Sequence, residues 1–142
     1  MQTVYNLVMI DMDLSYDDHA EEFNIGFFSS RCKAENTAAK YLSEVKGFKD
    51  YRVACRITEK QVIGASDSLI QPDVFVIYGW NENDEHDETD VIESDCYLSI
   101  WQAQEQLNAM KAKSDRKEWS IDKYRIDMCN WQEGFEKVYH PI

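Results

Sequence analysis

The stretch YRVACRIT, Tyr51 to Thr58, alternates apolar and polar side chains along its length. Alternation with a period of two places one set of side chains on each face of a β-strand, so that one face packs and the other meets water. The stretch DKYRIDM, Asp122 to Met128, alternates in the same way. The two stretches therefore predict strands of a sheet with one covered face.

Each of these strands follows a pattern that is typical of an amphipathic helix. Gly47 can supply the left-handed residue that ends the first helix, and Ser99 with Gln102 has the spacing of a capping box that begins the second. Each helix has one apolar face that needs a sheet to cover it. The apolar positions are Ala34, Thr37, Ala38, Tyr41, Leu42 and Val45 in the first helix, and Ile100, Ala103, Leu107 and Met110 in the second.

Two short apolar runs precede each helix, and the runs of a pair are separated by an acidic loop with one histidine. They are VYNLVMI (4–10) and FNIGFFSS (23–30) in the first half, and VFVIY (74–78) and DCYLSIW (95–101) in the second. The order strand, loop, strand, helix, strand thus occurs twice, at a period of about 70 residues. We expect short extra strands at residues 61–63 and 135–139. The predicted fold is α+β, with two tandem ββαβ repeats at 1–70 and 71–142, an antiparallel sheet, one helix packed on it per repeat, and pseudo-twofold symmetry.

Two segments carry a resemblance to a known family. GFKDY (47–51) and SIDKYRIDMCNWQEGF (120–135) resemble two pieces of one pattern, GFKDY followed by IDxYxLDxxxWxEGF, from an uncharacterised bacterial family of small ββαβ domains. The resemblance implies two diverged copies of an α+β domain, and it implies no activity, because the family has none established. The first half has Val62 where the tryptophan of the pattern would align, and the second has SDRKEW (114–119) where its Gly-Phe pair would stand. The matching positions in the second half are Ile121, Asp122, Tyr124, Asp127, Trp131, Glu133, Gly134 and Phe135.

Composition narrows the range of partners and compartments. With 142 residues and 44% hydrophobic side chains, the chain can bury one core, and we expect both halves to fold as one cooperative unit. The formal charge of -12 disfavours nucleic acid and anionic membranes, which bind clustered Lys and Arg. No apolar run approaches the roughly 18 residues of a membrane span, and the first residues do not resemble a signal peptide. We therefore expect a cytoplasmic protein.

The cysteines fit the same compartment. They stand far apart in the sequence, without the spacing of a metal site, which favours buried, reduced thiols. They are Cys32, Cys55, Cys96 and Cys129.

The acidic stretch NENDEHDETDVIESD, Asn81 to Asp95, contains eight carboxylates and no basic side chain. It is interpreted as a solvated loop, as a surface that steers a cationic partner, or as a metal site. Its alternating oxygen ligands are similar to a calcium-binding loop. However, His86 stands where that loop needs glycine, and Ile92 stands where it needs a bidentate glutamate.

A transition metal is the second possibility for the acidic loops. His19 lies beside Asp17, Asp18, Glu21 and Glu22, and His86 has similar neighbours. If the two loops met, they could supply imidazole and carboxylate ligands for zinc or iron. A metal-assisted hydrolase that uses His19 and His86 is therefore an alternative. The simpler interpretation is that both histidines are exposed to water and bind no metal. We expect no cofactor.

The sequence contains no recognisable catalytic signature. There is no G-x-S-x-G elbow, and with five glycines there is no glycine-rich loop for phosphate. We therefore predict that the protein is not an enzyme. The four tryptophans, Trp80, Trp101, Trp119 and Trp131, lie in the second half, and we expect most of them in the core.

The predicted function is a non-catalytic interaction protein that binds a basic protein through its acidic edge, with an immunity or inhibitor protein as the most specific form. Residues 71–142 carry 16 acidic and 7 basic side chains, whereas residues 1–70 carry 11 and 8. A homodimeric accessory domain, paired through a strand edge, is a further alternative. The candidate partner-binding residues are Glu82, Asp84, Glu85, Asp87, Glu88, Asp90, Trp131 and Glu133.

Overall fold

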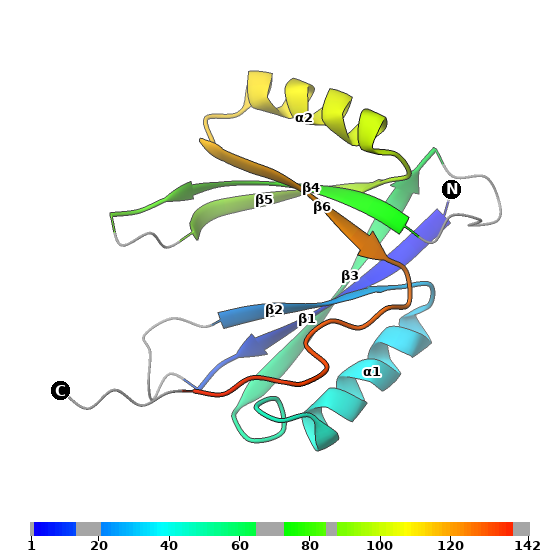
Figure 1. Cartoon of the computed structure of the whole chain (residues 1–142), viewed down its shortest axis with the longest axis vertical. Coiled ribbons are helices and arrows are strands. Elements are labelled where there is room, and N and C mark those ends of the chain that lie inside the picture. The colour runs from blue at the N-terminus through cyan, green and yellow to red at the C-terminus, as the bar shows by residue number, and fades with distance from the viewer. Residues whose placement is uncertain (1, 14–20, 65–72, 85–87, 138–142) are drawn as a thin grey trace. The chain divides into compact units, whose positions relative to one another are not determined.

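The computed structural model describes residues 2–13, 21–64, 73–84 and 88–137. These residues form an α+β fold of six strands and two helices, and the predicted fold class is confirmed (Figure 1). In chain order, the elements are β1 (Gln2–Asp11), β2 (Glu21–Phe28), α1 (Arg31–Glu44), β3 (Val53–Ile63), β4 (Asp73–Glu82), β5 (Glu88–Tyr97), α2 (Ile100–Lys113) and β6 (Glu118–Arg125).

The six strands are hydrogen-bonded in the order β2-β1-β3-β5-β4-β6. β1 is antiparallel to β2, and β4 is antiparallel to both β5 and β6. β3 and β5 are parallel, with Val62 beside Cys96 and Ile63 beside Tyr97. The prediction of an antiparallel sheet is wrong at this pair, so the sheet is mixed. Alternation along a strand fixes which side chains share a face, but it does not fix the neighbouring strand or its direction.

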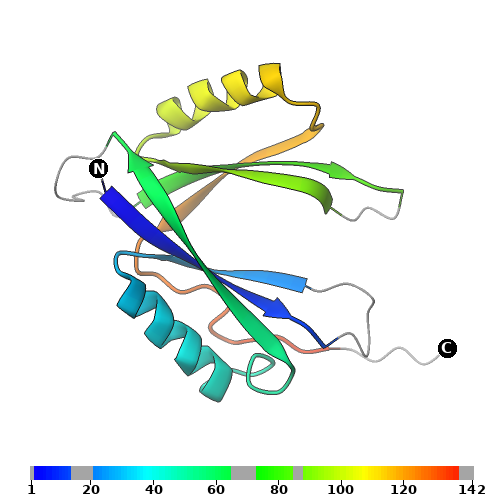
Figure 2. The ribbon, with the colours of Figure 1, turned by 180° about the vertical axis from the view of Figure 1, so that it is seen from behind.

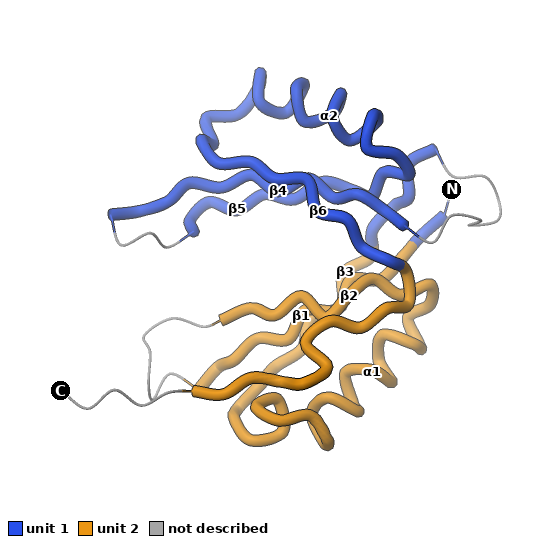
Figure 3. Tube along the Cα trace, viewed as in Figure 1, with its two compact units in different colours: residues 1–3, 60–125 blue, residues 4–59, 126–142 orange. Residues whose placement is uncertain are grey.

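The chain forms two compact units (Figure 3). Unit 1 comprises residues 1–3 and 60–125, and unit 2 comprises residues 4–59 and 126–142. The boundary between the units falls within β1, within β3 and directly after β6. The division of the sequence into repeats at 1–70 and 71–142 stays a prediction.

In unit 1, α2 packs against β4 and β5 (Figure 2). Ser99 begins the helix as predicted, and its hydroxyl accepts a hydrogen bond from the backbone N–H of Gln102 at 3.2 Å. Ile100 is exposed, although the helical stripe predicted it on the apolar face, because it is the first residue of the helix. The core contains Ile77, Ala103 and Leu107, with Phe75, Tyr97, Met110, Trp119 and Ile121 around them.

In unit 2, α1 packs against β2. Ser30 caps the helix by accepting from the backbone N–H of Lys33 at 3.2 Å, and Gly47 takes the predicted left-handed conformation, with a φ of 84°. Leu42 is exposed, so the buried face of this helix is narrower than the apolar face that the sequence predicted. The buried core contains Leu7, Met9, Phe23, Ile25, Phe28, Ala34, Ala38, Tyr41, Val45 and Phe48.

The ends of three predicted strands differ from the structure. Residues 61–63 are the end of β3 and not a separate strand. β6 ends at Arg125, before the alternation of residues 122–128 runs out, because Asp127 adopts a left-handed conformation with a φ of 63°. Residues 135–137 are not in a strand, and the rest of the expected strand at 135–139 lies outside the described residues.

All four cysteines are free thiols, but the prediction that they are buried is wrong for two of them. Cys32 lies on the solvent side of α1, and Cys55 lies on an exposed part of β3; Cys96 is buried and Cys129 is partly buried. Neither helix in the described part of the chain has the length and apolar character that a bilayer span requires.

Candidate functional site

The described residues of the acidic stretch, 81–84 and 88–95, lie in or directly after the strands of the antiparallel β4–β5 pair in unit 1. Glu82, the last residue of β4, is paired in register with Glu88, the first residue of β5. Two like charges placed directly opposite one another on a strand pair destabilise it. Both side chains are exposed to solvent, which screens this repulsion. The hairpin therefore displays negative charge at a cost to its own stability.

A β-bulge orients a further carboxylate next to this pair. The register shifts between Gly79 and Asn81, and Asp90 adopts a φ of 55°. A bulge turns a strand locally and changes the direction of a side chain, and Asp accepts the left-handed conformation more readily than most residues do. The side chain of Asp90 is exposed, while its backbone carbonyl accepts a 3.0 Å hydrogen bond from Nε of Arg116.

The connection between α2 and β6 holds the hairpin in place. The backbone N–H of Lys117 donates to Oδ1 of Asn81 at 3.0 Å, and the indole N–H of Trp119 donates to the carbonyl of Arg116 at 3.0 Å. The connection and the hairpin line an open depression of about 670 Å³. Its lining contains four carboxylates and one lysine, and is formed by Asn81, Glu82, Asn83, Asp84, Asp115, Lys117 and Glu118.

Four of the predicted partner-binding residues thus share one part of unit 1, and we call Glu82, Asp84, Glu88 and Asp90 the acidic hairpin. All four are exposed. Glu85 and Asp87, which the sequence also predicts at this site, lie outside the described residues.

Trp131 and Glu133, the two remaining candidates, belong to unit 2. Glu133 is exposed, and Trp131 packs edge-on against Phe23 with ring centroids 4.8 Å apart while remaining 48% exposed. The expectation that most tryptophans are in the core is wrong for Trp131 and for Trp101, which is 79% exposed. A position on a helix or loop surface overrides the preference of a large aromatic ring for the interior.

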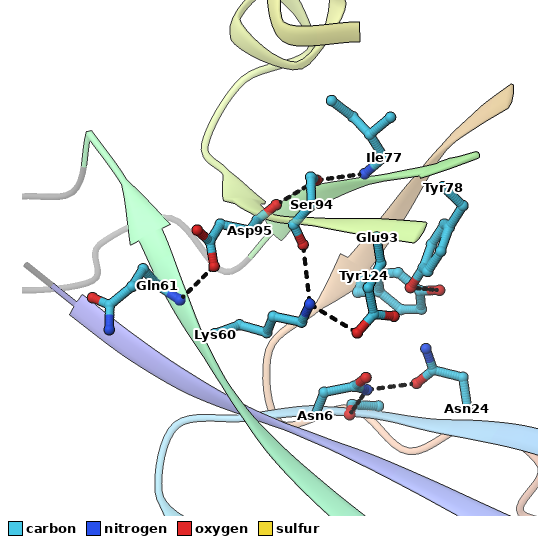
Figure 4. A network of polar contacts seen from close by, with 11 residues as sticks. Asn6, Asn24, Lys60, Gln61, Ile77, Tyr78, Glu93, Ser94, Asp95 and Tyr124 are labelled. Carbon is cyan, nitrogen blue, oxygen red and sulfur yellow. Dashed lines mark hydrogen bonds and ion pairs between the residues drawn. The ribbon is translucent and has the colours of Figure 1, made fainter. Parts of the chain in front are cut away.

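The two carboxylates nearest the end of the acidic stretch are engaged inside unit 1 (Figure 4). Lys60 is only 8% exposed; its ammonium lies 2.8 Å from Oε1 of Glu93 and donates to the carbonyl of Ser94 at 3.2 Å. Asp95 accepts a 3.2 Å hydrogen bond from the backbone N–H of Gln61. Glu93 and Asp95 therefore serve the fold, because a buried ammonium needs a carboxylate and hydrogen-bond acceptors around it.

Tyr78 and Tyr124 form a second polar contact in unit 1, with their hydroxyl oxygens 2.9 Å apart (Figure 4). Burial raises the pKa of both phenols, and each lies near negative side chains that raise the pKa further. Burial also raises the pKa of the nearby Cys96 thiol, to about 12. These three groups keep their protons at neutral pH, so none of them supplies a base or a nucleophile there.

The candidate metal ligands His19 and His86 lie outside the described residues. Within residues 2–13, 21–64, 73–84 and 88–137, no group of three or more His, Cys, Asp or Glu side chains has an arrangement that could hold a metal ion. The metal-assisted hydrolase stays an untested alternative.

Comparisons of the chain with family models, with curated proteins and with solved structures found no match. The resemblance carried by GFKDY and by residues 120–135 therefore stays a prediction. In the structure, the end of one piece packs against the other within unit 2: Phe135 contacts Phe48 with centroids 5.0 Å apart and Tyr51 with centroids 5.7 Å apart. The sequence pattern alone gave no reason to expect this contact.

Proposed function

We propose that the protein is a non-catalytic interaction protein that binds a basic protein through its acidic hairpin. The observation that carries the proposal is the exposed pair Glu82 and Glu88, opposed in register beside the bulged Asp90. A protein that needed these residues for stability alone would gain from an opposite charge at one of the two positions. The arrangement suits a surface whose negative charge acts on another molecule.

Negative charge on this surface accelerates association with a cationic partner and disfavours other partners. Among the described residues, the side chains of Asp84, Glu88 and Asp90 form no ion pair with a basic residue of the chain. Their charge is therefore available to a partner. An immunity protein, or another inhibitor of a nuclease, is the most specific form of this function, since a phosphate-binding cleft is basic. The four free thiols suit the cytoplasm as its location.

Charge reversal tests the proposal. The variant Asp84→Lys with Glu88→Lys changes the charge of the acidic hairpin, and Glu35→Lys with Glu44→Lys changes the charge by the same amount on the exposed face of α1 in unit 2. Each protein is immobilised and exposed to an extract of its source cells at low and at high salt. We expect the wild type and the α1 variant to retain the same basic protein at low salt and to release it at high salt. The hairpin variant should not retain it.

A follow-up with the purified partner measures rates. We expect the hairpin variant to associate about tenfold more slowly than the wild type at low ionic strength, and the difference should narrow as salt is added. Recovery of no basic protein by the wild type, or equal loss of binding in the two variants, would show that the acidic hairpin is not the binding surface.

We also propose that the chain arose by tandem duplication of a ββαβ unit, which the sequence predicts. Three observations support it. The strand order β2-β1-β3 of the first half matches β5-β4-β6 of the second. Both helices have 14 residues, and both begin at a serine, Ser30 and Ser99, that caps the backbone N–H three residues later. The pseudo-twofold symmetry stays a prediction.

A further inference from the structure

Unit 1 ends at a sheet edge that no other strand covers. β6 is the last strand in the sheet order, and β4 is its only neighbour among the described residues (Figure 1). In an antiparallel ladder, the backbone N–H and C=O groups of alternate residues point to opposite sides of the strand. Part of the backbone of β6 therefore points away from β4. No backbone hydrogen bond joins residues 118–123 to a described segment other than β4.

The first strand in the sheet order, β2, has an outer edge that is protected. In unit 2, the N–H of Asp127 donates to the carbonyl of Phe27 at 2.8 Å, and the N–H of Asn130 donates to the carbonyl of Ile25 at 2.7 Å. The pairing of β2 with β1 also contains a β-bulge. Covering segments and bulges both keep a strand edge from pairing with another chain.

Among the described residues, β6 has neither form of protection. Its residues pair with β4 in an unbroken register, from Glu118 opposite Trp80 to Arg125 opposite Asp73. The strand also contains no glycine or proline, which would interrupt the edge. A regular edge of this kind accepts a further strand through backbone hydrogen bonds.

The charges of β6 indicate which strand this edge fits. The strand carries two acidic side chains, Glu118 and Asp122, and two basic ones, Lys123 and Arg125, although the formal charge of the chain is -12. A strand without net charge does not attract a strongly basic partner as the acidic hairpin does. It fits a strand that also carries both charges, in the complementary order.

A second copy of β6 meets this condition in one register. When two identical strands pair antiparallel about a twofold axis, one residue lies opposite itself, and the others pair at equal distances on either side of it. Asp122 or Lys123 at this centre would place like charges directly opposite one another, which destabilises a strand pair. Ser120 at the centre would place Glu118 opposite Asp122, with the same effect.

Ile121 is the centre that remains. A centre at either of the two residues nearest each end would pair only a short part of the strand. Ile121 at the centre pairs residues 118–124 and places no like charges opposite one another. In unit 1, its side chain is partly buried against Ile77, Ala103 and Leu107. A second Ile121 would cover the part that is still exposed.

This register also forms two favourable pairs of side chains. Trp119 lies opposite Lys123 of the second copy, where an ammonium group can contact the face of the indole ring. Ser120 lies opposite Asp122 of the second copy, where a hydroxyl can donate to a carboxylate. Because the axis is twofold, each pair forms twice.

We propose that two copies of the chain form a dimer through β6, antiparallel and with Ile121 opposite itself, so that the sheet of unit 1 continues into the second copy. The acidic hairpin contains no residue of β6, so this dimer does not depend on the binding of a basic protein. Added salt screens the repulsion between two acidic chains and should strengthen the dimer, whereas it should weaken the binding of a basic partner.

Sedimentation equilibrium of the purified full chain measures the dimer. A single strand pair buries little surface, so we expect a weak dimer whose fraction rises with protein concentration up to about 1 mM. A chain that stays monomeric over this range at high salt would overturn the proposal. This result would leave the proposed function intact, because no basic partner is present.

A charge swap tests the register. Ser120→Asp places a carboxylate opposite Asp122 of the second copy at two symmetric positions, and we expect the dimer to weaken about tenfold. Ser120→Asp combined with Asp122→Lys places opposite charges there and should restore the dimer. Ser43→Asp on the exposed side of α1 makes the same change in net charge as Ser120→Asp and should leave the dimer unchanged. Equal effects of Ser120→Asp and Ser43→Asp would overturn the proposal.

A second variant guards against misfolding, because Ser120 is partly buried whereas Lys123 is exposed. Lys123→Glu removes the cation opposite Trp119 of the second copy, and we expect the dimer to weaken about fivefold. The melting temperature of each variant, measured at a concentration where the wild type is monomeric, shows whether it is folded. A folded Lys123→Glu variant that dimerises as well as the wild type would contradict the register.

A disulfide identifies the residue at the centre. The background variant Cys32→Ser, Cys55→Ser, Cys129→Ser removes the thiols that are not buried. In this background, we expect Ile121→Cys to form a covalent dimer on mild oxidation, since residues directly opposite one another lie within reach of a disulfide. Asp122→Cys should not, because it lies opposite Ser120. A dimer that crosslinks through Asp122→Cys and not through Ile121→Cys would overturn the proposed pairing.

Discussion

Gly134 shows how closely two backbones approach within unit 2. Its φ is 77°, and the carbonyl oxygen of Lys46 occupies the place of a side chain. Gly64 has a similar φ of 84°, but the atom nearest to its Cβ position is the end of the flexible Gln102 side chain, at 3.0 Å. A comparison of substitutions at the two glycines therefore distinguishes the free-energy cost of a left-handed conformation from that of a backbone clash.

We expect Gly134→Ala to lower the free energy of unfolding by about 3 kcal/mol and Gly64→Ala to lower it by about 1 kcal/mol. In both variants, alanine must adopt the unfavourable left-handed conformation. Only Gly134→Ala also displaces the backbone of residues 126–137. Urea denaturation monitored by tryptophan fluorescence measures both values. Equal losses would mean that Lys46 and Gly134 are not in contact.

The ionisation of Asp127 makes the packing of residues 126–137 in unit 2 depend on pH. Burial alone would raise the pKa of this carboxyl, but the hydrogen bonds from the backbone and side chain of Ser29 and from Lys33 outweigh it, so the pKa is lowered from its usual value. A folded-state pKa below the unfolded one means that the carboxylate stabilises the protein above the unfolded pKa. This contribution is lost as the pH falls through the folded pKa.

We therefore expect the wild type to be more stable than Asp127→Asn at neutral pH, and the two to converge as the pH falls from about 5 to about 2. Asparagine is the appropriate replacement because it tolerates the left-handed conformation and keeps a hydrogen-bond acceptor. Thermal melts in a pH series measure the difference. A difference that does not change with pH would mean that the Asp127 charge contributes nothing.

At the scale of single residues, the sequence predicted what depends on near neighbours in the chain. The capping serine Ser99 and the helix-ending Gly47 follow from local backbone geometry. The ion pair of Lys60 and Glu93 joins residues more than thirty positions apart in the chain, and nothing in the local pattern marks it. The same is true of the contact between Gly47 and Phe135.

The hairpin of β4 and β5 carries a prediction at the scale of the element. Glu88→Lys would place an opposite charge in register with Glu82. We expect this variant to be more stable than the wild type by about 0.5 kcal/mol, although it should bind the partner less well. Glu35→Lys on α1 is the control for the change in net charge. If both variants were stabilised equally, the increase in stability would come from the change in overall charge and not from the pairing of residues 82 and 88.

Periodicity predicted the elements, but it did not predict how they are joined. The alternation in YRVACRIT belongs to β3, which continues to Ile63 as one strand of 11 residues. Its parallel pairing with β5 depends on residues far away in the sequence. The alternation in residues 122–128 continues past Arg125, yet β6 ends there, because Asp127 adopts a left-handed conformation and its backbone N–H donates to the carbonyl of Phe27 in β2. Long-range contacts decide such ends.

At the scale of the whole molecule, the metal alternative can be tested without knowledge of a substrate. If the protein functions by binding, we expect protein purified without a histidine tag to contain no stoichiometric metal. We also expect its melting temperature to stay unchanged when zinc, manganese or calcium is added. Elemental analysis and thermal melts measure the two outcomes. One metal ion per chain would favour the hydrolase, with His19 and His86 as the first ligands to replace.

Charge and composition predicted a candidate site within residues 81–95, and they treated these residues as one surface. The structure divides that stretch, because the side chains of Glu93 and Asp95 are engaged with Lys60 and Gln61, whereas those of Asp84, Glu88 and Asp90 form no ion pair with a described basic residue. A count of carboxylates cannot separate these roles. The separation depends on the partner strand β3, which the sequence did not place beside β5.

The two segments of unit 2 are far apart in the sequence, so they are translated at different times. Residues 4–59 leave the ribosome long before residues 126–137 are made. At about 5–20 residues per second, the nascent chain waits on the order of ten seconds with the edge of β2 and the ring of Phe23 uncovered. Chains released early by a premature stop codon would keep that edge open permanently, which makes them natural substrates for chaperones and proteases.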